Sequence, residues 1–247
     1  VEGVEVTAHA DNGPGFSAFT DESGFYSMGV MLGEYDVEIE WQSLPGPYVI
    51  PYSEHIWVGD FAVATVNFTL HNANNTISGM VLLDSAPYPG AFIGATNELG
   101  YSVSMSSADG TYSLLVFGGS ETTYDLHVFN NDSENIIQVS NNWDIPAGSM
   151  NEDIYLETVA GGLHGYFVNG STMMPILDGN DMGMGMYNMD TEMEFYSGPN
   201  EDGYYQIHVP AGTYEVMAGG MNWMGPEPFT ITITDSLIYR DMILTHI

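Results

Sequence analysis

The feature that most constrains this chain is a turn-and-strand phrase that occurs three times. In each copy an acidic turn closes on a glycine, an aromatic residue follows two positions later, and a second turn leads to a tyrosine. The copies are DESGFYSMGVMLGEYDVEIE (21–40), SADGTYSLLVFGGSETTYDLHVF (107–129) and NEDGYYQIHVPAGTYEVMA (200–218). Repeats of about ninety residues, built from short strands with closely spaced turns, are typical of small antiparallel sandwiches.

The alternation of side chains supports strands rather than helices. In the first copy Tyr35, Val37 and Ile39 face one way, and the acidic residues between them face the other. This period of two is typical of a strand with one buried and one solvated face. No segment keeps a period of 3.6, so we expect little helix. We therefore predict an all-β fold of three tandem Ig-like or prealbumin-like antiparallel β-sandwiches, at 1–73, 74–159 and 160–247.

The first copy lacks a strand that the other two possess. Copies two and three open with TISGMVLLDSAPYPG (76–90) and GLHGYFVNGSTMMP (162–175), whereas aligning GVEVTA (3–8) with GAFIGA (90–95) leaves the first copy without a counterpart. An unpaired strand edge must be covered, by chain preceding Val1 or by a strand from a neighbouring subunit, unless the alignment is at fault. The predicted assembly edge consists of Val1, Gly3, Val4, Val6 and Ala8.

These phrases resemble a known family. NEDGYYQIHVPAGTYEV (200–216), ISGMVLLDSAPYPGAFIGA (77–95) and SADGTYSL (107–114) are similar to the carboxypeptidase regulatory-like domain and to collagen-adhesin B-type repeats. The resemblance implies a prealbumin-like (transthyretin-like) sandwich and a noncatalytic, extracellular role. Many adhesin relatives form a lysine–asparagine isopeptide cross-link. This chain has no lysine and therefore cannot form that bond.

Charge excludes two classes of partner. The chain has 33 acidic residues and one basic residue, Arg240, which gives a net charge of −32. Such a surface repels nucleic acid phosphates and anionic lipids, so we expect no nucleic acid partner. No apolar run approaches the length of a membrane span, and we expect no membrane insertion. Because cysteine is absent, disulfides and thiolate metal sites are excluded.

Two stretches could hold metal ions. Met182, Met184 and Met186 alternate along MGMGM, and thioethers are ligands of Cu(I), although methionines at inward positions more often fill a core. Oxygen ligands for Ca²⁺ are offered by Asp178, Asn180 and Asp181, yet the spacing of an EF-hand loop is missing and a solvated turn explains them better. We predict no cofactor other than this Ca²⁺ candidate, and we assign no catalytic residue.

Surface modification and sugar binding are further possibilities. Four N-x-S/T sequons are candidates for N-glycosylation: Asn67, Asn74, Asn131 and Asn169. Exposed tryptophans can stack on sugars, but packing in a core or between repeats is the commoner fate of such residues. We expect that fate for Trp41, Trp57, Trp143 and Trp223.

The sequence thus predicts a non-enzymatic structural protein, secreted or displayed at the cell surface. It would be the subunit of an extracellular filament, fibre or stalk, polymerised with copies of itself, with strand donation between subunits and glycans as further features. The alternative is a carbohydrate-binding accessory or adhesin module of a larger secreted protein. Surface tryptophans beside a groove would favour that alternative, and a covered strand edge would favour the polymer.

Overall fold

The computed structural model describes residues 1–10, 13–60, 62–129, 135–177 and 182–247. Across these ranges the chain is built from β-strands, apart from a short 3-10 helix, η1 (Trp41–Ser43). The predicted all-β class is confirmed. The chain divides into two compact units. The first comprises Val1–Val81, Pro87–Phe129 and Asn142–Asp153, and the second comprises Leu82–Ala86, Asn130–Asn141 and Ile154–Ile247.

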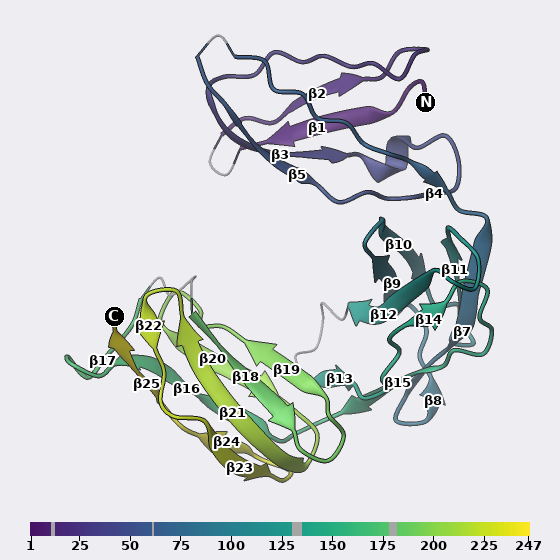
Figure 1. Cartoon of the computed structure of the whole chain (residues 1–247). Helices are drawn as coiled ribbons and strands as arrows, with labels where there is room; N and C mark the ends of the chain where they lie inside the picture. Colours follow the sequence, from purple (N-terminus) through teal and green to yellow (C-terminus); the bar gives the residue numbers. More distant parts are fainter. Residues whose placement is uncertain (11–12, 61, 130–134, 178–181) are drawn as a thin grey trace. The chain divides into compact units, whose positions relative to one another are not determined.

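The first repeat contains one four-stranded antiparallel sheet of order β2-β1-β3-β5 (Figure 1). Its strands are β1 (Glu5–His9), β2 (Phe16–Phe19), β3 (Gly33–Ile39) and β5 (Glu54–Val58). The predicted alternation along β3 is confirmed, because Tyr35, Val37 and Ile39 are buried. Val6 and Ala8 of β1 complete the inner face together with Val58.

The other side of this core is formed by chain that belongs to no strand. Residues 25–31 and 62–70 are extended segments without strand assignment, and Figure 1 draws them without arrows. Their inward residues pack against the sheet: Tyr26, Met28, Val30, Val66 and Phe68. The first repeat therefore has one complete sheet and, facing it, two separate lengths of chain.

The connection between the first and second repeats, residues 71–76, is largely paired. His71–Asn72 form strand β6, which pairs antiparallel with β4 (Tyr48–Val49), and β7 begins at Asn75. A backbone bond from the Ala73 N–H to the Pro47 carbonyl extends this pairing. Pairing with a distant segment therefore decides the conformation of this polar stretch.

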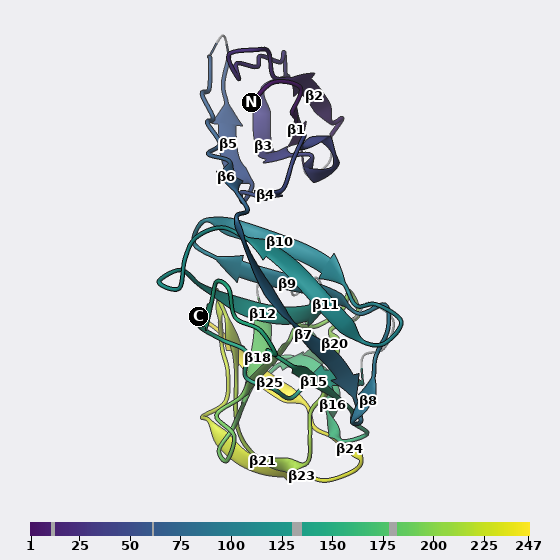
Figure 2. The same cartoon turned by 90° about the vertical axis from the view of Figure 1, so that its right-hand side faces the viewer.

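The second repeat contains two sheets, of order β10-β9-β12-β14 and β11-β7-β15-β13. Figure 2 shows β7 beside β11, with β8 next to its end. The strands are β7 (Asn75–Leu83), β8 (Ala86–Pro87), β9 (Phe92–Asn97), β10 (Gly100–Met105), β11 (Thr111–Val116), β12 (Thr123–Phe129), β13 (Ile136–Gln138), β14 (Ile145–Pro146) and β15 (Ile154–Thr158).

The third repeat surrounds a larger core. Its strands are β16 (Gly162–Asn169), β17 (Met174–Pro175), β18 (Met182–Asn188), β19 (Glu194–Ser197), β20 (Tyr204–His208), β21 (Gly212–Gly220), β22 (Trp223–Met224), β23 (Phe229–Ile233), β24 (Leu237–Tyr239) and β25 (Met242–His246). β16 pairs antiparallel with β20 and parallel with β24 and β25. Among the described residues its core cluster contains 13 buried residues, against five in the core cluster of the first repeat.

The three acidic turns have the same conformation. Gly24, Gly110 and Gly203 have φ of 80°, 81° and 78°, which glycine adopts without steric cost. In each turn the glycine N–H donates to the carbonyl three residues earlier, on Asp21, Ser107 and Asn200 respectively. This agreement confirms that the phrase found in the sequence encodes one local structure in all three copies.

Candidate assembly groove

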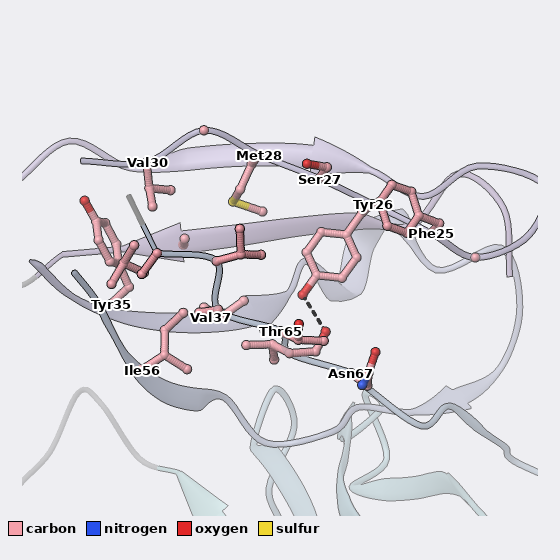
Figure 3. A pocket seen from close by; sticks show the side chains of 18 residues that line it. Phe25, Tyr26, Ser27, Met28, Val30, Tyr35, Val37, Ile56, Thr65 and Asn67 are labelled. Carbon is pink, nitrogen blue, oxygen red and sulfur yellow. Dashed lines mark hydrogen bonds between the residues drawn. The ribbon is translucent and has the colours of Figure 1, made fainter. Parts of the chain in front are cut away.

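A groove opens in the first repeat between its two strandless segments (Figure 3). It has a volume of about 450 Å³. Residues 24–30 line one wall and residues 62–67 line the other, while Ala8, Val37 and Ile56 of the sheet line the floor. Figure 3 shows Tyr26, Met28 and Val30 pointing from their segment toward the floor.

The other two repeats have a strand at the corresponding place. β7 lies between β11 and β15, and β16 lies between β20 on one side and β24 and β25 on the other. The turn glycines align 25–30 with β11 and β20, and the closing leucines Leu70, Leu156 and Leu244 align the other wall. We call the strand that begins copies two and three, β7 or β16, the opening strand. The groove of the first repeat lies at the position that this strand takes in the other two repeats.

The wall side chains are more exposed in the first repeat than at the same positions of the other two repeats. In the second repeat Tyr112, Leu114, Val116, Ile154 and Leu156 are at most 4% exposed. Their counterparts in the third repeat, Tyr205, Ile207, Val209, Met242 and Leu244, are at most 6% exposed. In the first repeat the same five positions are only half-buried: Tyr26, Met28, Val30, Phe68 and Leu70. An opening strand would cover this remaining apolar surface.

A tyrosine hydroxyl spans the same two walls in each copy. The Tyr26 hydroxyl donates to the Val66 carbonyl at 2.9 Å, and the Tyr112 hydroxyl donates to the Glu152 carbonyl at 2.5 Å. The Tyr205 hydroxyl makes the equivalent bond to the Arg240 carbonyl. The geometry that spans an opening strand in two copies is thus already present across the open groove.

Burial governs the acidity of these hydroxyls. It raises the pKa of Tyr26, and it also raises the pKa of Tyr112 and Tyr205, where nearby acidic residues add to the effect. Removing a phenolate from water is unfavourable, so each hydroxyl stays protonated and can donate at neutral pH.

The predicted assembly edge is wrong in its position. Val1, Gly3, Val4, Val6 and Ala8 lie on or just before β1, which is paired on both sides, with β2 and with β3. Val4, Val6 and Ala8 are buried in the core. The open edges instead belong to 25–30 and 62–70 in the facing layer. The alignment compares strands along the chain but does not show which segments an opening strand would pair with, because pairing between distant segments is a tertiary property.

The sequence analysis names neither Tyr26 nor Val66 as a site residue. It names Asn67 only as a candidate for N-glycosylation. A signal was available. Aligning ATVNFTL (64–70) with MNEDIYL (150–156) and IYRDMIL (238–244) places these wall residues opposite positions that contact an opening strand.

The metal candidates divide into two groups. Asp178, Asn180 and Asp181 lie outside the described residues. Met182, Met184 and Met186 are on β18, at 7%, 2% and 0% exposure, inside the core cluster of the third repeat. The expectation that they fill a core is confirmed. Among the residues described here, no three His, Asp or Glu side chains lie close enough together to hold a metal ion.

The sequons lie in different surroundings. Asn67 is exposed at the groove wall. Asn74 is exposed, and its side-chain oxygen accepts from the Gly118 N–H. The Asn169 side chain caps a turn by accepting from the Ser171 N–H. Asn131 lies outside the described residues.

The tryptophan expectation is wrong for three of four residues. Trp41, Trp57 and Trp143 are 50%, 62% and 51% exposed, whereas Trp223 packs against the core of the third repeat. The three exposed tryptophans lie at η1, on the edge strand β5 and in a connection, respectively.

Comparison with known proteins identifies no family for this chain. No family model matches, and no curated protein matches. Among solved structures, the TIE protein of Bacillus anthracis is similar, with 16% identity, 99% of this chain and 48% of that chain covered, and a TM-score of 0.32. This chain thus spans about half the length of that protein.

Two further solved structures are pilins. The shaft pilin SpaA from Lactobacillus rhamnosus GG has 10% identity over 70% of this chain and 98% of its own, with a TM-score of 0.29. A variant of BcpA, the major pilin subunit of Bacillus cereus, has 10% identity over 99% and 95%, with a TM-score of 0.30. At these scores the likeness assigns no function.

Within the described ranges, no helix has the length and apolar character needed to cross a bilayer.

Proposed function

We propose that this chain is a subunit of an extracellular filament in which a β-strand from a neighbouring subunit completes the first repeat. The observation that carries the proposal is the groove between 25–30 and 62–67, at the position that an opening strand takes in the other two repeats. Covering it pairs two free strand edges and buries apolar side chains, at about 1 kcal/mol for each half-buried residue.

The proposed subunit consists of three sandwiches, at 1–73, 74–159 and 160–247. The recurring turn and the recurring tyrosine bond support this division. The charge of −32 keeps filaments apart in solution except where cations screen it. In this proposal Asn74 and Asn169 are the glycan sites among the described residues.

The test of this function combines electron microscopy with a cross-link from the groove. The chain has no cysteine, so Thr65→Cys on the groove wall introduces a single thiol for a benzophenone reagent. Assemblies are made from equal amounts of ¹⁴N and ¹⁵N chains, irradiated, digested and analysed by mass spectrometry. We expect filaments in micrographs and cross-linked peptides that join light to heavy chains.

The matched control is Tyr239→Cys, at the corresponding position of the third repeat, where the chain supplies its own opening strand. Its cross-links should join peptides of one isotope only. Single, unassembled chains in micrographs, or Thr65→Cys links confined to one isotope, would contradict the proposal.

A second candidate function is binding of polysaccharide, which the exposure of Trp41, Trp57 and Trp143 favours. Quenching of tryptophan fluorescence by soluble glycans, lost in the triple Trp→Ala variant, would support this function. Unchanged fluorescence across a glycan panel would exclude it for those glycans.

A further inference from the structure

We infer that the groove selects a donor strand of the pattern apolar–x–Gly–x–apolar, and that Asn67 fixes its register by accepting a hydrogen bond from the residue after the glycine. The inference rests on the proposed function, because the donor is taken to be a strand of a neighbouring copy. It adds the orientation of the donor strand, its sequence pattern and the side chain that fixes its register.

The orientation follows from the two opening strands already in the chain. β7 is antiparallel to β11, and β16 is antiparallel to β20. On the opposite side β16 is parallel to β24 and β25, and the bridge between Ser78 and Met150 is also parallel. A donor in the groove therefore runs antiparallel to 25–30 and parallel to 64–70.

The donor needs a glycine because the backbone carbonyl of the second wall lies very close to the opening strand. Gly79 pairs with Tyr112, and Gly165 pairs with Tyr205. A Cβ at Gly79 would lie 2.3 Å from the Glu152 carbonyl oxygen, and one at Gly165 would lie 2.1 Å from that of Arg240. Only glycine fits beneath the tyrosine bond. The donor therefore places a glycine opposite Tyr26.

The apolar positions lie two residues on either side of that glycine. Ile77 and Val81 flank Gly79, and Leu163 and Phe167 flank Gly165 in the same way. All four side chains are 0% exposed. The apolar residue two positions before the glycine, Ile77 or Leu163, opposes Leu114 in one repeat and Ile207 in the other. In the groove the corresponding donor residue therefore faces Met28.

The register depends on two further bonds that both complete repeats share. The Glu152 N–H donates to the Ser78 carbonyl, and the Arg240 N–H donates to the His164 carbonyl, each on the residue before the glycine. The N–H of the residue after the glycine donates to a carboxylate, from Met80 to Asp153 and from Tyr166 to Asp241, at 2.9 Å in both cases.

Asn67 occupies the position of these two aspartates. Val66 aligns with Glu152 and Arg240, and Asn67 aligns with Asp153 and Asp241. Asn67 is exposed and lines the groove, with its amide oxygen available as the same kind of acceptor (Figure 3). A glycan on this amide would occupy the site of the strand, so Asn67 serves the joint although it lies in a sequon.

The experiment uses the full chain and a fluorescent peptide with the sequence of residues 75–85, NTISGMVLLDS. Binding is measured by anisotropy, and hydrogen exchange locates it. We expect protection of 25–30 and 64–70. The peptide carrying Gly79→Val should bind at least tenfold more weakly, because its side chain meets the Val66 carbonyl.

Variants of the chain test Asn67 itself. Asn67→Asp keeps the acceptor and should bind the peptide within about threefold of the unaltered chain, whereas Asn67→Leu leaves a buried N–H unpaired and should weaken binding about tenfold or more. Thr69→Ala removes the sequon but keeps Asn67, and should leave binding unchanged. Circular dichroism confirms that each variant folds.

Equal binding of the glycine and valine peptides, protection elsewhere in the chain, or equal affinity of Asn67→Asp and Asn67→Leu would overturn the inference. These outcomes are separate from those that test the filament. If the chain binds the peptide in this register but forms no filament, the inferred register stands and the proposed filament function is contradicted. Filaments that form equally well with Asn67→Leu overturn the register alone.

Discussion

The Tyr26 hydroxyl donates a hydrogen bond to the carbonyl of Val66, 40 residues later in the chain, across the open side of the first repeat. In the second repeat the same bond passes over the glycine of an opening strand. The two walls of the first repeat are therefore joined by the same hydrogen bond that crosses an opening strand in the second repeat.

Loss of this tyrosine bond should cost less in the first repeat than in the second. Tyr112→Phe leaves the Glu152 carbonyl without this partner in a complete sandwich, and we expect about 1–3 kcal/mol of destabilisation. Tyr26→Phe affects a half-solvated wall, and we expect less than about 1 kcal/mol. Urea unfolding followed by hydrogen exchange resolves the two repeats. An equal or reversed order would contradict the open groove.

Alanine at the opening-strand glycines should be strongly destabilising. Gly79→Ala and Gly165→Ala each press a methyl group against a backbone carbonyl, and we expect about 3 kcal/mol or more in thermal or urea unfolding. The control is Gly183→Ala on β18, where the nearest atom is 3.4 Å away. Its effect should stay within about 1 kcal/mol. Tolerance of alanine at both Gly79 and Gly165 would remove the steric reason for the donor pattern.

Titration of Tyr26 should report whether the groove is filled. Its pKa is raised by burial, so the folded state favours the protonated hydroxyl. The resulting stability is present below the unfolded pKa of about 10 and is lost as the pH rises through the folded value. The difference in absorbance at 295 nm between the unaltered chain and Tyr26→Phe isolates this group. We expect titration above pH about 10, at still higher pH when the 75–85 peptide is bound. No upward shift with peptide would contradict burial of Tyr26 by the strand.

Oxidation should separate the core methionines from the surface ones. Met150 and Met221 are 73% and 82% exposed, whereas Met184 and Met186 are 2% and 0% exposed. Dilute peroxide should convert the first pair to sulfoxides well before the second, as measured by peptide mass spectrometry. Early oxidation of Met186 would contradict its place in the core.

Local features were predictable from the sequence because neighbouring residues determine them. The turn at Gly24 needs a positive φ that glycine supplies, and the alternation from Tyr35 to Ile39 defines a strand with one buried face. Both predictions agree with the structure.

The candidate site was less predictable because it depends on pairing between distant segments. The sequence predicts the assembly edge at Val1, Gly3, Val4, Val6 and Ala8. In the structure β1 is paired on both sides, and the groove walls lie in the facing layer. The sequon at Asn67 is a local pattern that the sequence alone shows. The alignment of Asn67 with Asp153 and Asp241 suggests an acceptor role only once the hydrogen bonds of those aspartates are known. Exposure of Trp57 likewise follows from its place on the edge strand β5.

The two walls of the groove differ in the strand direction that they accept. Residues 25–30 correspond to an antiparallel neighbour of the opening strand, and residues 64–70 correspond to a parallel one. A guest segment can satisfy both in a single direction only. In the proposed filament, successive subunits joined in this way would all point the same way, so the polymer would be polar with two chemically distinct tips. Growth can then be halted at one tip alone, by a short peptide that fits the last unfilled subunit.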